Sequence, residues 1–328
     1  DRGDLNVINL ECVLSDRSRL HKPFSEILIA PERSIRFLSG NRINVVTTAN
    51  NHALDHGIDA LKRSIELLES HGIAVMGYRP GTCFQSTPVI VPVRGRRIGF
   101  LGYNISNFPS EDRRRVVDRI KGALAEARGS VDTLVVSMHW GEEYSHIPPP
   151  HVIRFGREIL DAGCDILHGH HAHQIQGVLR DGNRIFAPSL GNFVFDQMIH
   201  SNRITAILSV SIEGDAPDFE FLPYYLNRRF QPEPAPRYAV HIERLNRYLA
   251  ESYAPGSEDR YAEIIRARVR QGHRRNRIRM RLKMLGRFPI YLPYRREIQA
   301  YRASRKKLFS VVDCEDSLAR EMDLSQTR

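Results

Sequence analysis

Four short segments contain most of the side chains that could bind a metal ion: Asn9–Glu11, Asn50–His52, His139–Gly141 and His168–His173. Each follows an apolar run rich in β-branched residues, so each is expected at the carboxyl end of a buried strand. Open α/β sheets place their ligand sites at these ends. Nitrogen and oxygen donors that converge from several strand ends suit a divalent or dinuclear metal centre. The residues therefore indicate a metal-dependent hydrolase, or a protein built on the scaffold of one.

The histidine-rich segment is the strongest local signal, because four histidines occur within six residues: His168, His170, His171 and His173. In an extended segment, the imidazoles of His171 and His173 could reach a common metal pair, and the small Ala172 would let the backbone come close. A polar surface loop is the alternative interpretation. It explains so dense a cluster less well.

The segment Asn50–His52 follows the predicted strand 43–46 and precedes a predicted helix. An Asn side-chain oxygen can bind a hard or borderline cation, and the neighbouring His52 can donate a proton to a leaving group. The alternative is an ordinary N-terminal turn of a helix, because Asn and Asp are good caps. We expect Asp55 to fill that capping position.

One further histidine and three acids complete the candidate set. His139 follows an apolar strand, and its alternative role is that of a core-edge residue packed on Trp140, the only tryptophan of the chain. Glu142 and Glu143 come next, either as loop acids or as partners that orient imidazoles. Glu11 is the only acid placed at a strand end where a carboxylate could bridge two metals.

Apolar strands and amphipathic helices alternate over residues 1–225, which predicts an α/β sheet with parallel segments and, because of the hairpins, a mixed or layered one. The predicted strands are 5–9, 43–46, 73–75, 88–93, 97–102, 131–137, 165–167, 174–179, 184–187, 204–212 and 219–225. The predicted helices are 57–70, 111–128 and 152–162. Residues 231–236 are proline-rich and are interpreted as an extended linker. The chain beyond them is expected to be helical and polar.

The positive charge is concentrated near the C-terminus. Residues 260–307 contain 17 Lys and Arg but only two acids, Glu263 and Glu297, a local charge of +15. The rest of the chain therefore carries 10 − 15 = −5. Such a segment can bind a polyanion or an anionic membrane surface, or can simply be a solvated helical face. No nucleic-acid recognition motif accompanies it, so a nucleic-acid partner is not expected.

Composition sets the expected organisation and location. We predict a domain over 1–227 and a linker with a basic, mainly helical region over 228–328. The four cysteines are scattered, which argues against a disulfide framework. This favours a cytoplasmic location, or a membrane-associated or extracellular one if an anchor precedes the segment. The oligomeric state is left open.

Five motifs, in order, resemble the CapA family of poly-γ-glutamate capsule biosynthesis proteins over roughly residues 4–200. They are Val7–Glu11, Ala49–Gly57, His139–Tyr144, Gly169–His173 and Ser189–Asp196. The resemblance implies a calcineurin-like metallophosphoesterase fold, a four-layered α/β/β/α sandwich with a basic, mainly helical C-terminal appendage.

The resemblance also implies roles for individual residues. Asn51 matches a metal-bound Asn, His52 the catalytic His, His139 an isolated ligand, and His171 and His173 the paired ligands. Glu11 stands near the bridging carboxylate of the family, with Asn9 as a weaker candidate. Six residues are expected to orient ligands or contact substrate, together with Asn9: Asn50, Asp55, Glu143, His170, Asn192 and Asp196.

The family resemblance implies two divalent cations in a complete site, drawn from Mn, Fe, Zn or Mg. The family's first strand carries a Gly-Asp motif that has no match here, so one of the two metal positions is expected to be weaker. The favoured activity is attack of a metal-bound hydroxide on a phosphoester, or on a γ-glutamyl amide, with His52 as proton donor.

Two other functions stay open at this point. The protein could be a non-catalytic accessory of a poly-γ-glutamate synthase complex, with an anionic polymer and synthase subunits as partners. It could also bind polyanions or membrane surfaces through residues 260–307.

Overall fold

The computed structural model describes residues 3–256, with gaps at 17–27, 79–83, 107, 197–199, 215 and 255. The basic segment 260–307 therefore lies outside the described residues. The described chain divides into two compact units, with the boundary between Leu134 and Val135. None of the helices in this part is both long and apolar enough to cross a membrane.

The first unit alternates strands and helices, as the sequence predicts. Its elements are β1 (Val7–Asn9), β2 (Val13–Leu14), β3 (Ile29–Ala30), η1 (Glu32–Ser34), α1 (Ile35–Gly40), β4 (Val45–Thr47), α2 (Ile58–Ser70), β5 (Ala74–Met76), β6 (Val89–Val93), β7 (Arg96–Asn104), α3 (Ser110–Ala127) and η2 (Arg128–Ser130). The strands β1, β4 and β5 form a parallel sheet in the order β1-β4-β5. In its register Asn9 lies opposite Thr47, so the carboxyl ends of β1 and β4 meet.

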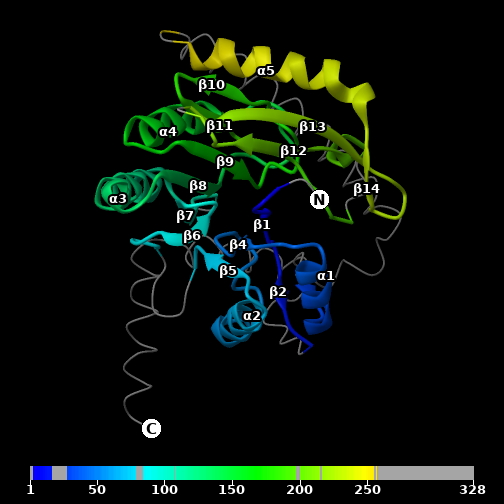
Figure 1. Cartoon of the computed structure of the whole chain (residues 1–328). Coiled ribbons are helices and arrows are strands. Elements are labelled where there is room, and N and C mark those ends of the chain that lie inside the picture. Colours follow the sequence, from blue (N-terminus) through cyan, green and yellow to red (C-terminus); the bar gives the residue numbers. More distant parts are fainter. Residues whose placement is uncertain are drawn as a thin grey trace, which may run out of the picture. The chain divides into compact units, whose positions relative to one another are not determined.

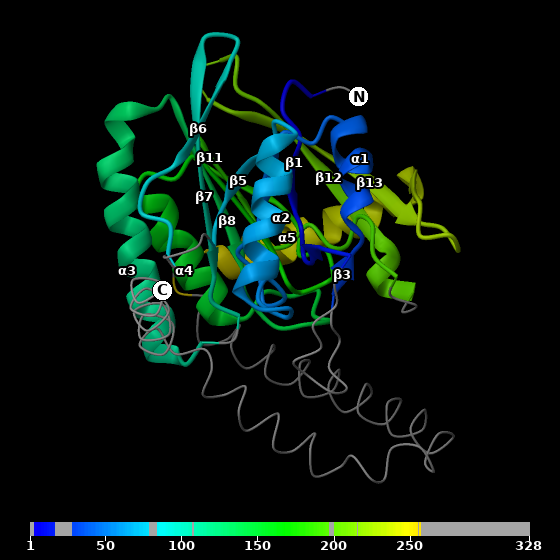
Figure 2. The same ribbon diagram turned by 90° about the horizontal axis from the view of Figure 1, so that it is seen from below.

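The core of the first unit is formed by the apolar faces of its helices. Leu61, Ile65 and Leu68 lie on one face of α2, and they pack with Val46 and Val75 of the sheet. This spacing of three and four residues is the amphipathic pattern that predicted the helix. Figure 2 shows α2 beside β5 within this unit. The crossover from β4 through α2 to β5 is thus held by burial of its apolar side.

The strands predicted at 88–93 and 97–102 form the antiparallel hairpin of β6 and β7. Arg94 and Gly95 both have positive φ, 47° and 81°, as a two-residue turn between antiparallel strands requires. A buried glutamine ties β7 to the end of β5. The Oε1 of Gln85 accepts from the backbone N–H of Gly77 at 2.9 Å and of Gly102 at 3.0 Å.

The second unit contains the carboxyl-terminal part of β8 (Thr133–His139), and β8 itself crosses the unit boundary. The further elements are α4 (Pro150–Asp161), β9 (Ile166–His170), β10 (Leu179–Asp181), β11 (Arg184–Ala187), η3 (His200–Arg203), β12 (Ile204–Ser211), β13 (Asp218–Leu226), β14 (Pro232–Pro234), η4 (Pro236–Tyr238) and α5 (Ala239–Tyr253). Strands β8, β9 and β11 are parallel neighbours, and β10 adds antiparallel to β11. Helix α4 lies tight on this sheet, because a Cβ at Gly156 would come within 2.6 Å of the Phe186 ring.

A second, antiparallel sheet in this unit consists of β12, β13 and β14. Helix α5 runs along β10 and β13 (Figure 1), and Ile242 and Leu245 pack with Ile175, Ile204 and Ala206. The proline-rich residues are extended, as expected, but they also pair with β13 as the edge strand β14. The domain boundary at 227/228 stays a prediction.

The mixed α/β class is confirmed, and one predicted strand is wrong. Residues 174–179 do not form a continuous strand, because only Ile175 makes an isolated bridge, to Leu190, before β10 starts at Leu179. The interruption is at Gly177, whose φ is 88°. A Cβ there would come within 2.9 Å of the carbonyl of Leu245, so the close approach of α5 explains the glycine.

Candidate metal centre

The first unit presents a carboxylate on a chain of amide hydrogen bonds. The Nδ2 of Asn9 donates to Glu11 Oε2 at 3.0 Å, and the Oδ1 of Asn9 accepts from Asn50 Nδ2 at 3.1 Å. Asn50 also donates to the carbonyl of Leu10 at 2.9 Å and accepts from the backbone N–H of His52 at 3.1 Å. Both ends of the Asn9 amide are thus engaged, which makes Asn9 an orienting partner of Glu11.

The predicted catalytic histidine has a carboxylate partner. His52 Nδ1 lies 2.6 Å from Asp55 Oδ2, and both residues are buried. If Nδ1 carries the proton and donates to the carboxylate, Nε2 faces away from Asp55 and is available for proton transfer. The expected capping role of Asp55 is wrong: α2 begins after Gly57, and no side chain caps it. Asp55 is instead used to hold an imidazole.

Asn51 lies in the chain between Asn50 and His52. It is buried, in the same turn as Asn50 and His52. The ligand role of its side-chain oxygen stays a prediction.

The second unit presents imidazoles from one face of β8 and β9. In the register of these parallel strands, Ser137 lies opposite His168, and His139 lies opposite His170. Side chains two residues apart on a strand share a face. His170 uses both ring nitrogens there: Nδ1 lies 2.9 Å from His139 Nδ1, and Nε2 lies 2.8 Å from Ser137 Oγ.

The paired histidines follow β9 in a bent segment. The prediction of an extended segment is wrong, because His171 and His173 have positive φ, 87° and 54°. Such angles are unfavourable for residues with a Cβ and often mark functional sites. They bring the ring of His171 to 4.7 Å from that of His139, measured between centroids.

The spacing of the nitrogens is suited to a cation. One nitrogen of His139 and one of His171 lie within 4.8 Å of each other. Two metal–nitrogen bonds of about 2.1 Å span at most about 4.2 Å, so small rotations of the rings suffice for both to bind one ion.

A partner at Nδ1 fixes the tautomer of His173. This nitrogen lies 2.8 Å from Asn192 Oδ1, while Asn192 Nδ2 donates to the carbonyl of Asn202. The amide orientation makes His173 Nδ1 the donor, which leaves the lone pair on Nε2. The ring is also stacked on Tyr144, with the planes 24° apart.

Burial keeps the imidazoles of His168 and His170, which neighbour the candidate ligands in the chain, neutral. It lowers the pKa of His168 to about 4, and burial together with the adjacent histidines lowers the pKa of His170 well below its usual value. The neutral form, with a free lone pair, is the one that binds metals. The donor chemistry therefore fits a divalent transition metal.

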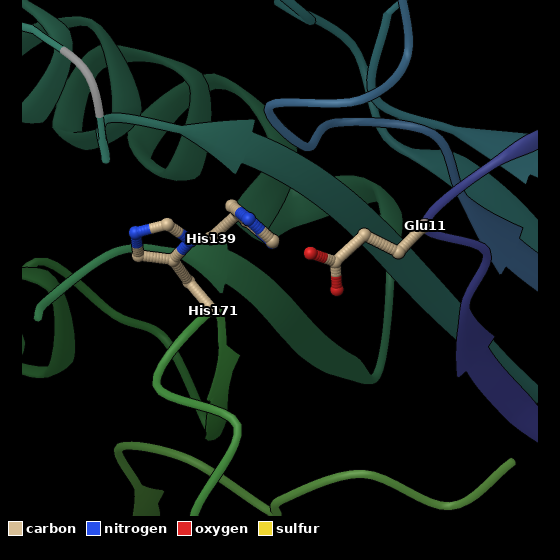
Figure 3. Close-up of side chains that lie close together, drawn as sticks. All are labelled: Glu11, His139 and His171. Atoms are coloured by element: carbon tan, nitrogen blue, oxygen red, sulfur yellow. The ribbon is translucent and has the colours of Figure 1, made fainter. Parts of the chain in front are cut away.

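Figure 3 draws the side chains of Glu11, His139 and His171, which offer a carboxylate oxygen and two imidazole nitrogens, the donor types that suit a borderline cation. Glu143 is half-buried in the loop after β8, and Asp196 is exposed.

Sequence reasoning missed three residues of this site: Ser137, Asn202 and Tyr144. Ser137 could have been found from its position two residues before His139 on the same strand. Asn202 could not, because its carbonyl accepts from Asn192 Nδ2 only through the tertiary arrangement of the chain. The alternative role of His139, a core-edge residue packed on Trp140, finds no support in the contacts of Trp140. This tryptophan donates its indole N–H to the carbonyl of Pro188 and packs edge-on against Phe186.

Comparison with known proteins agrees with the motifs. The chain is 31% identical over 206 residues to the capsule biosynthesis protein CapA of Bacillus anthracis, a match that covers 56% of this chain and 48% of that protein. It is 26% identical over 215 residues to the PGA biosynthesis protein CapA of Bacillus subtilis, covering 62% and 56%. The chain thus spans about half the length of these curated relatives.

Among solved structures, a putative 5'-nucleotidase from Staphylococcus aureus aligns with a TM-score of 0.42 and 17% identity, over 67% of this chain and 44% of that one. The model of the family described as "Bacterial capsule synthesis protein PGA_cap" matches residues 1–197. The CapA resemblance is confirmed, and the chain belongs to the PGA_cap family of bacterial capsule synthesis proteins.

Proposed function

We propose that this protein is a divalent-metal-dependent hydrolase that acts in the biosynthesis of a capsule polymer of the poly-γ-glutamate type. The names of its relatives support the process, and the side chains described above support the chemistry. The observation that carries the proposal is the buried set of imidazoles, in which His173 is held through Nδ1 and presents Nε2.

The candidate ligands of each unit would supply different donor atoms to a metal. His139, His171 and His173 supply nitrogen, whereas Glu11 and Asn51 supply oxygen. A bound divalent cation lowers the pKa of a coordinated water toward neutrality and neutralises negative charge that develops on a phosphoryl or carbonyl oxygen.

The protein's own groups would handle the proton and the orientation of the donors. His52 in its doubly protonated form, with Nδ1–H donating to Asp55, would give its Nε2 proton to the leaving oxygen or nitrogen and become the neutral Nδ1–H ring. Asn9 and Asn50 would keep the Glu11 carboxylate in place. A phosphoester is the favoured substrate, and a γ-glutamyl amide is the alternative.

The test combines metal content and hydrolysis. Purified protein is expected to carry Mn, Fe or Zn in near-stoichiometric amount, and the double variant His171→Ala/His173→Ala is expected to lose most of it. The control is His71→Ala/His200→Ala, which removes two exposed histidines and should leave the metal content unchanged.

Activity is then measured on a panel of phosphoesters and on γ-glutamyl peptides. Equal metal content in both double variants would contradict the metal centre. Metal binding without turnover of any substrate on the panel would instead favour the non-catalytic accessory role.

A further inference from the structure

We infer that His170 is a positioning residue that, together with Ser137, fixes which nitrogen of His139 faces the metal. The inference rests on the proposed metal centre and adds to it an orienting pair for one ligand. His170 would not bind the metal itself.

Hydrogen bonding leaves His139 only one ring nitrogen that can bind a metal. Its Nδ1 is 2.9 Å from His170 Nδ1, so that nitrogen is occupied and only Nε2 can bind a cation. For Nε2 to hold a lone pair, the proton must be on Nδ1 of His139, and His170 Nδ1 must accept it. A neutral imidazole that accepts at Nδ1 carries its own proton on Nε2.

Ser137 provides the acceptor for that second proton. His170 Nε2 lies 2.8 Å from Ser137 Oγ, and neither Ser137 nor His139 is exposed to solvent. The metal-competent direction is therefore His139 Nδ1–H to His170 Nδ1, and His170 Nε2–H to Ser137 Oγ. In the reverse direction a proton would sit on His139 Nε2, which would block that ligand.

The strand register holds this hydrogen-bonded relay, from His139 through His170 to Ser137, in place. Ser137 and His139 come from one face of β8, and His170 lies opposite His139 on β9. Backbone pairing of the two buried strands thus fixes both distances. Metal-binding imidazoles are commonly held in this way by a partner at the other ring nitrogen; here the partner is a neutral histidine, where a carboxylate or carbonyl is more usual.

His168 offers a matched control. It lies on the same face of β9, two residues before His170, and its ring centroid is 5.9 Å from that of His170. Its Nδ1 is buried and makes no hydrogen bond within the described part of the chain. The same substitution at 168 and at 170 therefore removes similar ring polarity, but only the change at 170 breaks the relay.

The experiment compares His170→Phe with His168→Phe by Zn²⁺ titration and by ¹⁵N NMR of the imidazoles. In the parent protein we expect Nδ1-protonated His139 with Zn²⁺ on Nε2. His170→Phe should weaken Zn²⁺ binding about 10- to 100-fold and give mixed His139 tautomers, whereas His168→Phe should change affinity less than about threefold. Equal affinities and an unchanged His139 tautomer in both variants would overturn the inference.

Two further measurements keep the outcome decisive. If His170→Phe does not fold, Ser137→Ala retains every imidazole and should still weaken Zn²⁺ binding, about tenfold or less; unchanged affinity there would also count against the relay. If the parent protein binds no Zn²⁺, the proposed function fails. The His139–His170 hydrogen bond can still be tested without metal, through the nitrogen–nitrogen coupling across it.

Discussion

The two units hold their donors by different means. In the first unit, Glu11 is held by side-chain amides, in a chain that runs from Asn50 through Asn9 to the carboxylate. In the second unit, the imidazoles of His139 and His170 are fixed by the register of two fully buried strands, and His171 by a positive φ. The oxygen donor is thus set by side-chain torsions, and the nitrogen donors by the backbone.

The difference has a chemical reason. Carboxylates accept metals over a range of angles, so a hydrogen-bonded carboxylate on a flexible stem can adjust. An imidazole donates only along its ring plane and only from an unprotonated nitrogen, so its orientation and tautomer must both be set. We therefore expect substitutions in the first unit to alter proton transfer and the position of the carboxylate. Substitutions in the second unit should alter metal retention and folding.

The largest effect is expected for His52→Ala in the first unit. Loss of the proton donor should slow hydrolysis of esters with poor leaving groups about 10²- to 10⁴-fold, and activated esters much less. Metal content should stay close to that of the parent, because the imidazoles of the second unit are intact. Equal losses on both ester types, or loss of the metal, would give His52 a structural role and remove the contrast between the units.

Next in size is Gly169→Ala in the second unit. A Cβ at this position of β9 would collide with the carbonyl oxygen of Pro188 and with the indole nitrogen of Trp140. Backbone or indole would have to move, so we expect a loss of about 2–4 kcal/mol in the free energy of unfolding.

The matched change for that prediction is Gly122→Ala, on the exposed face of α3, where a Cβ meets nothing within 4 Å. It should be neutral or stabilise by up to about 1 kcal/mol. Denaturant unfolding measures both. Similar stabilities for the two variants would mean that the strand ends of the second unit adapt more freely than the contacts indicate.

The smallest effect concerns acid pH. His146 lies in the loop between β8 and α4, 3.2 Å from the carbonyl of Ile175, and it faces His241 and Arg244 of α5. Burial, above all, lowers the pKa of His146 from 6.5 to about 4, with contributions from His241 and Arg244. Since the unfolded chain takes up the proton more readily, this contribution to stability is complete above pH 6.5 and is lost as the pH falls from 6.5 toward 4.

Measured between pH 7.5 and 5.0, the loss attributable to His146 should be about 2 kcal/mol. His146→Gln should remove that part of the pH dependence while the rest of the curve keeps its shape. Parallel curves of unfolding free energy against pH for the parent and the variant would show that His146 does not cause this pH dependence.

The sequence alone determined the element types and most of the candidate residues. Apolar runs and three-to-four-residue spacing correctly predicted the strands that end at His139 and His170 and the helix α2, because these patterns depend on burial of one face. The motif order identified the family. It also gave the candidate ligands and proton donor, whose roles stay predictions.

Tertiary structure decided the partners. Asp55 could be a cap or a companion of His52, and only the turn before Gly57 settles which it is. The positive φ of His171 and His173 and the relay from His139 through His170 to Ser137 depend on how β8 pairs with β9 and how the following segment bends. Local sequence sets which face a side chain occupies, but the nitrogen it presents depends on a neighbour distant in the chain.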